Sequence, residues 1–162
     1  MISSQTIDGV GSYARAFIDG SCLGNPGAGG WAVVLEHDGQ SSVHFESSRE
    51  QRTTNNRMEL TAAISALRIA IDRGIGPGRL EIWTDSLYVQ QGITKWVAAW
   101  IRNEWRTSRG RPVQNRDLGE SLLELAERQR PSWNWIRGHS GLSSMHAQAD
   151  LVAREAALAA RP

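Results

Sequence analysis

The alternation of apolar and polar residues predicts three strands in the first third of the chain. They cover residues 13–19, 31–35 and 42–47. In the first, apolar residues occupy every second position, and the pair Asp19-Gly20 predicts a turn at its end. The glycine-rich segment 24–30 predicts a loop, and Asp38-Gly39 predicts a hairpin between the second and third strands.

A helical period begins after these strands. Leucine and isoleucine recur at positions 60, 64, 67 and 71, which predicts one apolar stripe on a helix over residues 57–72. Further strands are predicted over residues 80–84 and 133–137, and further helices from Ser86 and over residues 95–105, 117–129 and 150–160. Three successive strands followed by alternating helices and strands indicate an α/β fold, with one mixed sheet and helices packed on it.

Length and composition indicate one folded domain. The chain has 162 residues, of which 40% are hydrophobic, so we expect a single domain over residues 13–162 after a polar arm over residues 1–12. The lone Cys22 excludes an internal disulfide and suits a reducing compartment. The N-terminal residues lack the pattern of a signal peptide, and no apolar run approaches the roughly 18 residues of a membrane span. We therefore expect a cytoplasmic protein with no membrane partner.

Charge is distributed unevenly along the chain. The net charge is only +1, but residues 95–116 hold six basic side chains against the single acidic Glu104. That segment therefore carries +5, and the remainder carries −4. A basic segment on an acidic body suggests a polyanionic partner beside a site that needs negative charge of its own.

Four carboxylates lie where predicted elements begin or end. Asp19 closes the first strand, Glu59 lies in the first turn of the long helix, Asp85 follows the strand 80–84, and Asp150 opens the last helix. Element ends of this kind meet in the crevice where α/β proteins build their sites.

Each carboxylate also fits a purely structural role. Asp19 could form a turn, and Glu59 could complete a capping box with Asn56. Asp85 could cap the helix that follows it, and Asp150 could complement a helix dipole. Residue types and spacing alone leave both interpretations open.

Four segments resemble the motifs of type 1 ribonuclease H and occur in that family's order. They are Ile18-Asp19-Gly20-Ser21-Cys22-Leu23-Gly24-Asn25-Pro26-Gly27, Arg52-Thr53-Thr54-Asn55-Asn56-Arg57-Met58-Glu59-Leu60, Thr84-Asp85-Ser86-Leu87-Tyr88-Val89, and Trp135-Ile136-Arg137-Gly138-His139-Ser140-Gly141 with Ala149-Asp150. The resemblance spans residues 17–153. It implies a ribonuclease H-like fold, in which a five-stranded sheet has three antiparallel strands followed by two parallel ones. It also implies hydrolysis of the RNA strand of RNA–DNA hybrids, leaving 5′-phosphate and 3′-hydroxyl ends.

The resemblance assigns the four carboxylates to a metal site. Asp19, Glu59, Asp85 and Asp150 would hold two Mg²⁺ ions, with Mn²⁺ as a possible substitute. Physical chemistry agrees, because carboxylates crowded together stay ionised only beside a hard cation. Two such ions can activate a water molecule and stabilise the leaving oxygen. His139 would help to transfer protons or release product.

The resemblance also assigns substrate contacts. Asn25, Asn55 and Asn56 would read the minor groove of the hybrid, although asparagines also form turns and caps. Arg52 and Thr54 would belong to a pocket for a DNA phosphate. A basic handle over residues 95–116, with Trp96, Arg102 and Arg106, would grip the DNA strand. The helical period places Trp105 opposite Trp96, so at least one of the tryptophans in this segment should belong to the core. We expect the protein to act as a monomer.

Three features depart from the family pattern. Members often carry Asn-Glu four and three residues before the last aspartate, where this chain has His146 and Ala147. The loop between His139 and Asp150 is about one residue longer. Leu87 stands where many members have a polar residue, and Ala99 stands where some have an asparagine in the phosphate pocket.

Two other functions remain open at this point. A nucleic-acid-binding module with no chemistry gains nothing from four clustered negative charges. A glycosidase with paired carboxylates leaves the basic handle unexplained.

Overall fold

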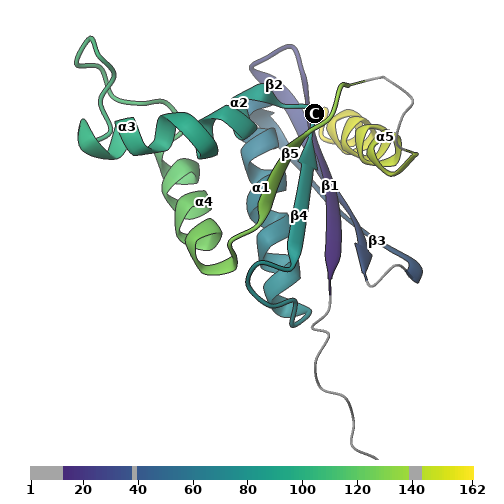
Figure 1. The fold of residues 1–162 in the computed structure, drawn as a ribbon. Helices are drawn as coiled ribbons and strands as arrows, with labels where there is room; N and C mark the ends of the chain where they lie inside the picture. The colour runs from purple at the N-terminus through teal and green to yellow at the C-terminus, as the bar shows by residue number, and fades with distance from the viewer. Residues whose placement is uncertain (1–12, 38–39, 139–143) are drawn as a thin grey trace, which may run out of the picture.

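The structure, a computed structural model, describes residues 13–37, 40–138 and 144–162 (Figure 1). The predicted arm over residues 1–12, the predicted turn at Asp38-Gly39 and the predicted site residue His139 lie outside the described residues. No helix in the described part of the chain is both long and apolar enough to cross a membrane.

Five strands form one mixed sheet with the order β3-β2-β1-β4-β5. They are β1 Ala14–Leu23, β2 Gly27–His37, β3 Gln40–Thr53, β4 Leu80–Thr84 and β5 Ser132–Trp135. The β1–β2 and β2–β3 pairs are antiparallel, whereas β1–β4 and β4–β5 are parallel. The predicted sheet of three antiparallel and two parallel strands is thereby confirmed.

Helices cover both faces of this sheet. They are α1 Asn55–Asp72, α2 Leu87–Gln91, the π-helix η1 Gly92–Trp96, α3 Val97–Arg102, α4 Arg116–Gln129 and α5 Ser144–Ala159. Helix α1 packs on one face and is itself covered by α4, whereas α5 packs on the opposite face (Figure 1).

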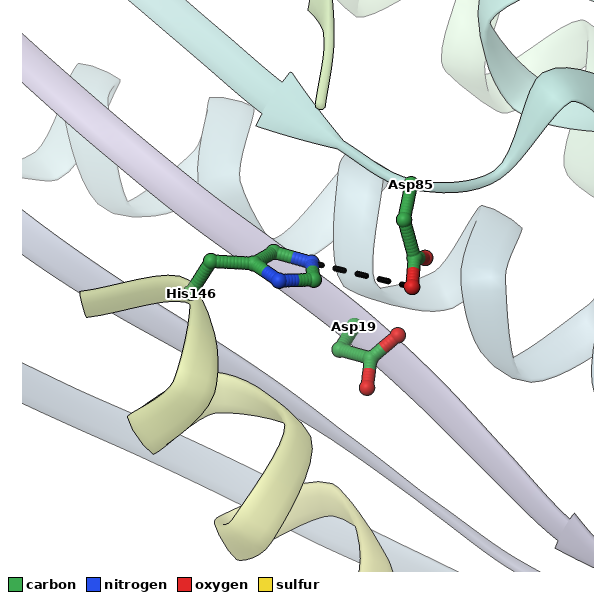
Figure 2. A group of neighbouring side chains, drawn as sticks. All are labelled: Asp19, Asp85 and His146. Carbon is green, nitrogen blue, oxygen red and sulfur yellow. Dashed lines mark ion pairs between the residues drawn. The ribbon is translucent and has the colours of Figure 1, made fainter. Parts of the chain in front are cut away.

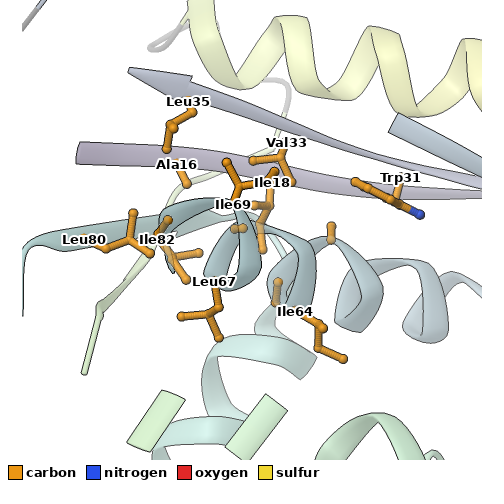
Figure 3. Packing of buried hydrophobic residues seen from close by; sticks show 14 of the residues in the cluster. Ala16, Ile18, Trp31, Val33, Leu35, Ile64, Leu67, Ile69, Leu80 and Ile82 are labelled. Atoms are coloured by element: carbon orange, nitrogen blue, oxygen red, sulfur yellow. The ribbon is translucent and has the colours of Figure 1, made fainter. Parts of the chain in front are cut away.

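The strand alternation sorts side chains between two hydrophobic clusters. Ala16 and Ile18 of β1 join the larger cluster beneath α1, part of which Figure 3 shows. Phe17 lies between them in the chain and joins the smaller cluster beneath α5. Neighbouring residues of a strand point to opposite faces, so this division confirms the period of two predicted for β1.

Two predicted boundaries in the glycine-rich region are wrong. Strand β1 continues to Leu23, so Asp19-Gly20 is not a turn, and β2 already begins at Gly27. A Cβ atom at Gly20 would lie 2.4 Å from the backbone nitrogen of Glu59, and one at Gly30 would lie 2.6 Å from that of Ala157. These glycines allow α1 and α5 to approach the strands closely, which explains their presence without a turn or loop.

The predicted helix over residues 95–105 is also wrong in its extent. Helix α3 ends at Arg102, and Glu104 and Trp105 have φ angles of 52° and 57°. The chain turns there, and Trp105 is buried with 9% of its surface exposed. Its ring lies 6.1 Å from that of Trp100. The expectation that one tryptophan of this segment belongs to the core is confirmed for Trp105.

Candidate active site

The close packing of α1 on β1 brings the first two carboxylates together. Asp19 and Glu59 are both buried, each with 4% of its surface exposed. The backbone N–H of Gly20 donates a hydrogen bond to the Glu59 carboxylate, which also forms a hydrogen bond with Asp19. Helix α1 begins at Asn55, so Glu59 lies in its second turn, not in the predicted first turn.

The third carboxylate is held at the end of β4. The Nε1 atom of Trp135 donates to the backbone oxygen of Asp85 at 3.1 Å, and the N–H of Ser86 donates to Thr84 Oγ1 at 3.0 Å. A Cβ atom at Gly138 would lie 2.6 Å from Asp85 Oδ2. Glycine at this position therefore leaves the room that the Asp85 carboxylate occupies.

Helix α5 adds two polar side chains from the other face of the sheet. Asp150 forms a hydrogen bond with Asp19 and an ion pair with Arg154, at 3.0 Å between Nη2 and Oδ2. His146 lies one turn earlier, with 5% of its surface exposed, and its Nε2 atom is 3.9 Å from Asp85 Oδ2. The helix begins at Ser144, so Asp150 does not open it as predicted.

The cluster makes ionisation of its buried members costly. Burial, followed by the charges of Glu59 and Asp85, raises the pKa of Asp19 to about 10. Burial, followed by the charge of Asp85, raises the pKa of Glu59 to about 8, although the hydrogen bonds from Gly20 and Asp19 oppose the shift. Without a cation, the protonated forms of Asp19 and Glu59 are therefore favoured at neutral pH.

These residues fit a divalent cation. Glu59 Oε2 is buried and has no hydrogen-bond partner among the described residues. Buried polar atoms are ordinarily satisfied, so this oxygen lacks a partner of the kind that a metal ion would supply. One ligand atom from each of Asp19, Asp85 and His146 lies within 4.8 Å of the others (Figure 2). Oxygen-rich sites of this type are what Mg²⁺ and Mn²⁺ prefer.

The helix-capping roles that the sequence allowed for Glu59 and Asp85 are wrong, because other residues cap both helices. Thr54 caps α1, because its side chain accepts the N–H of Arg57 at 3.3 Å, so Asn56 and Glu59 form no capping box. Ser86 caps α2 by accepting the N–H of Val89 at 3.2 Å, so Asp85 is not the cap. The carboxylates come together at one point without the structural roles that could have explained them singly.

Comparison with known proteins finds a family whose sequence model covers most of the chain. The sequence model of RNase H matches residues 12–158 of the chain. The chain belongs to the ribonuclease H family.

Individual members of the ribonuclease H family are similar in sequence to this chain over most of their length. Ribonuclease HI of Xylella fastidiosa (strain 9a5c) is 46% identical, over 91% of this chain and 93% of the relative. Ribonuclease H of Alkalilimnicola ehrlichii is 50% identical, over 85% of this chain and 90% of the relative. The solved structure of LC9-RNase H1, described as a type 1 RNase H with the type 2 active-site motif, superposes with a TM-score of 0.80. It is 31% identical and covers 94% of this chain and 75% of its own.

Family membership decides between the functions that the sequence left open. Ribonucleases H are metal-dependent hydrolases of the nuclease class, so the chain is an enzyme. A binding module without chemistry and a glycosidase are both excluded.

The structure places the three predicted groove-reading asparagines at the start of α1 and in the β1–β2 turn beside it. Asn25 Oδ1 accepts the backbone N–H of Asn55 at 2.9 Å, which joins the turn before β2 to the helix. Asn56 is exposed one residue further along the helix, and Arg52 is exposed near the end of β3. Thr54 is half-buried as the α1 cap. These five residues therefore lie on neighbouring segments.

The predicted handle forms a separate projection. The rings of Tyr88, Trp96, Trp100 and Trp105 follow one another at 6.1–6.2 Å. Trp96 is 37% exposed, and Arg102 and Arg106 are exposed beyond it. The Arg106 guanidinium donates to the backbone oxygen of Gly110 at 3.0 Å, within its own loop.

One residue of the site was not predicted from the sequence. His146 was noticed only as a departure from the family pattern, at a position where many members have asparagine. Its spacing of four residues from Asp150 places the two on one helical face, which is the signal that could have drawn attention to it.

Proposed function

We propose that the chain is an endonuclease that hydrolyses the RNA strand of RNA–DNA hybrids, with Asp19, Glu59, Asp85 and Asp150 as its metal-binding carboxylates. The observation that carries this proposal is the convergence of these side chains from β1, α1, β4 and α5 in a ribonuclease H fold. We propose Mg²⁺ as the working metal, with Mn²⁺ as a substitute, because the cluster is dominated by carboxylate oxygens.

The protein contributes to the mechanism by positioning the metal ions and by supplying their carboxylate ligands. Divalent ions in such a cluster lower the pKa of a bound water and stabilise charge on the leaving oxygen. A bound cation would favour the ionised forms of the buried Asp19 and Glu59, which would then hold it. Asp85 and Asp150 are more exposed and lie closer to solvent. His139 is proposed to move a proton to or from the reacting groups, because an imidazole can both donate and accept a proton.

Recognition of the hybrid is proposed to occur at the start of α1. The minor groove of a hybrid displays 2′-hydroxyl groups, which distinguish RNA from DNA. Because Asn25 Oδ1 is engaged by Asn55, the amide nitrogen of Asn25 is its group for donating to groove edges. Asn55 and Asn56 are proposed to extend this contact, and Arg52 and Thr54 to hold a phosphate of the DNA strand.

A panel of labelled duplexes tests this function. We expect cleavage of the RNA strand of an RNA–DNA hybrid in the presence of Mg²⁺ or Mn²⁺, with 5′-phosphate products. Single-stranded RNA, double-stranded RNA and double-stranded DNA should remain intact, as should the hybrid in the presence of a chelator. Metal-dependent cleavage of DNA alone, or cleavage of the hybrid in chelator, would contradict the proposal.

The basic handle should contribute to the affinity for the hybrid and not to the turnover rate. We expect the double variant Arg102→Ala/Arg106→Ala to bind hybrid more weakly and to reduce the slope of log affinity against log salt by about 1 to 2, because each phosphate contact contributes roughly 0.9. The rate at saturating substrate should change little, since α3 and the loop after it lie to one side of the sheet that carries Asp19 (Figure 1). Binding titrations over a salt series, combined with steady-state kinetics, measure both quantities.

A matched double variant controls for charge alone. Arg79 and Arg128 are exposed near the start of β4 and the end of α4, at the end of the sheet opposite Asp85. Arg79→Ala/Arg128→Ala removes the same charge and should leave the salt slope nearly unchanged. Equal slopes for the two double variants would show that net charge, and not the handle, governs binding.

We further propose that residues 13–162 act as one catalytic domain, as a monomer in the cytoplasm. The packing of α1 and α5 on the two faces of one sheet supports a single domain.

A further inference from the structure

His146 is placed among the metal-binding carboxylates by the start of α5. It lies one helical turn before Asp150 and is buried, with 5% of its surface exposed. Figure 2 shows its ring pointing from α5 across β1 toward Asp85, with Asp19 beside the two. The ring is therefore part of the site, at a position where many family members have asparagine.

The spacing between these groups suits an ion held among them. His146 Nε2 is 3.9 Å from Asp85 Oδ2, which is longer than a hydrogen bond. Ligand atoms of Asp19, Asp85 and His146 all lie within 4.8 Å of one another. Metal–ligand distances of about 2.0–2.2 Å place two ligands of one ion roughly 3–4.5 Å apart. Small side-chain adjustments would thus allow one ion to contact all three.

A second observation concerns Glu59, which forms a hydrogen bond with Asp19 and so lies next to these three residues. The Oε2 atom of Glu59 is buried and lacks a hydrogen-bond partner within the described part of the chain. Glu59 comes from α1, on the opposite face of the sheet from α5. Side chains from both faces of the sheet therefore meet at Asp19, and a buried oxygen without a partner lies beside the proposed ligands.

We propose that His146 is a nitrogen ligand of a divalent metal ion shared with Asp19 and Asp85, and that it shifts the preference of the site toward Mn²⁺ over Mg²⁺. The inference rests on the metal site of the proposed function and adds a ligand to it. The chemical reason is that Mg²⁺ favours an all-oxygen shell, whereas transition metals accept imidazole nitrogen more readily. An asparagine at this position, as in many family members, offers an oxygen that does not make this distinction.

The direct test is spectroscopic. With Mn²⁺ bound to the wild-type protein, electron spin-echo envelope modulation should detect coupling to a ligand ¹⁴N nucleus, and labelling with ¹⁵N-histidine should change that coupling. We expect the signal to disappear in His146→Asn and to persist in Gln148→Ala, an exposed residue on the same helix. The coupling should also persist in His139→Ala. That variant retains His146, so a persisting signal excludes His139 as the source of the nitrogen.

Metal titrations supply a second readout. His146→Asn should weaken Mn²⁺ binding by about tenfold or more, since even residues that only support metal ligands contribute 10–100-fold. Mg²⁺ binding should change less, so the ratio of Mn²⁺ to Mg²⁺ affinity should fall. Gln148→Ala should retain the wild-type ratio.

The outcomes separate this inference from the proposed function. If wild-type protein binds Mn²⁺ and Asp19→Asn abolishes the binding, but no histidine coupling is seen, His146 is not a ligand and the carboxylate site stands. A coupling that survives in His146→Asn, or an unchanged affinity ratio, overturns the inference in the same way. If wild-type protein binds neither ion, both the inference and the proposed metal site fail.

Discussion

Replacement of Asp85 by asparagine should lower the rate of hybrid cleavage by about 10³-fold or more while the protein stays folded. The charge stabilisation that metal ions supply in such sites amounts to several kcal/mol, and each 1.4 kcal/mol corresponds to a tenfold change in rate. The substituted amide would retain the shape of the Asp85 side chain beside Gly138 but lose the charge that attracts a cation. Asp19→Asn should have a comparable effect. Single-turnover cleavage of a labelled hybrid at saturating metal measures the loss.

Asp72→Asn is the matched control for these variants. Asp72 is exposed at the end of α1, so the same chemical change there should leave cleavage close to the wild-type rate. Circular dichroism and thermal melting verify that each variant is folded. Cleavage by Asp85→Asn within about tenfold of the wild type would show that this carboxylate is not a metal ligand in the reaction.

In chelator, the protein should become less stable as the pH rises from about 5 to 8. The pKa values of Asp19 and Glu59 are raised in the folded state to about 10 and about 8, from ordinary values of 3.8 and 4.5. The folded state therefore binds protons more tightly than the unfolded state, and the free energy of unfolding falls with pH between the two sets of values. The stability is fully present below about pH 4 and is lost progressively above it.

Asp19→Asn should remove much of this pH dependence. We expect its melting temperature in chelator at pH 8 to exceed that of the wild type by roughly 4–8 °C, which corresponds to about 2 kcal/mol in a domain of this size.

Adding millimolar Mg²⁺ or Mn²⁺ should raise the wild-type melting temperature, because ions that bind only the folded state stabilise it. Asp19→Asn should respond less to the ions.

Differential scanning calorimetry over a pH series, with and without metal, provides the comparison. Asp72→Asn again serves as the control and should follow the wild-type profile, since its carboxylate is exposed. If the melting temperatures of wild type and Asp19→Asn change with pH in parallel in chelator, ionisation of the buried Asp19 does not destabilise the folded protein.

Local pattern was enough to predict most elements of the fold. The period of two in β1 assigned its side chains to the correct faces, and the apolar run 80–84 coincides with β4. The predicted helix 57–72 lies within α1. These predictions succeed because burial of one face imposes a period that neighbouring residues carry by themselves. The sequence also singled out the carboxylates, through motifs whose residues are close together in the chain.

Tertiary structure alone decided what the glycines do and which side chains meet. The pair Asp19-Gly20 is common in turns, but here Gly20 lies within β1, where α1 packs closely against it near Glu59. His146 was only a departure from a pattern until α5 placed its ring 3.9 Å from Asp85, 61 residues earlier in the chain. Such contacts join segments that are distant in sequence. Their energies depend on helix–sheet packing, so no local period or propensity encodes them.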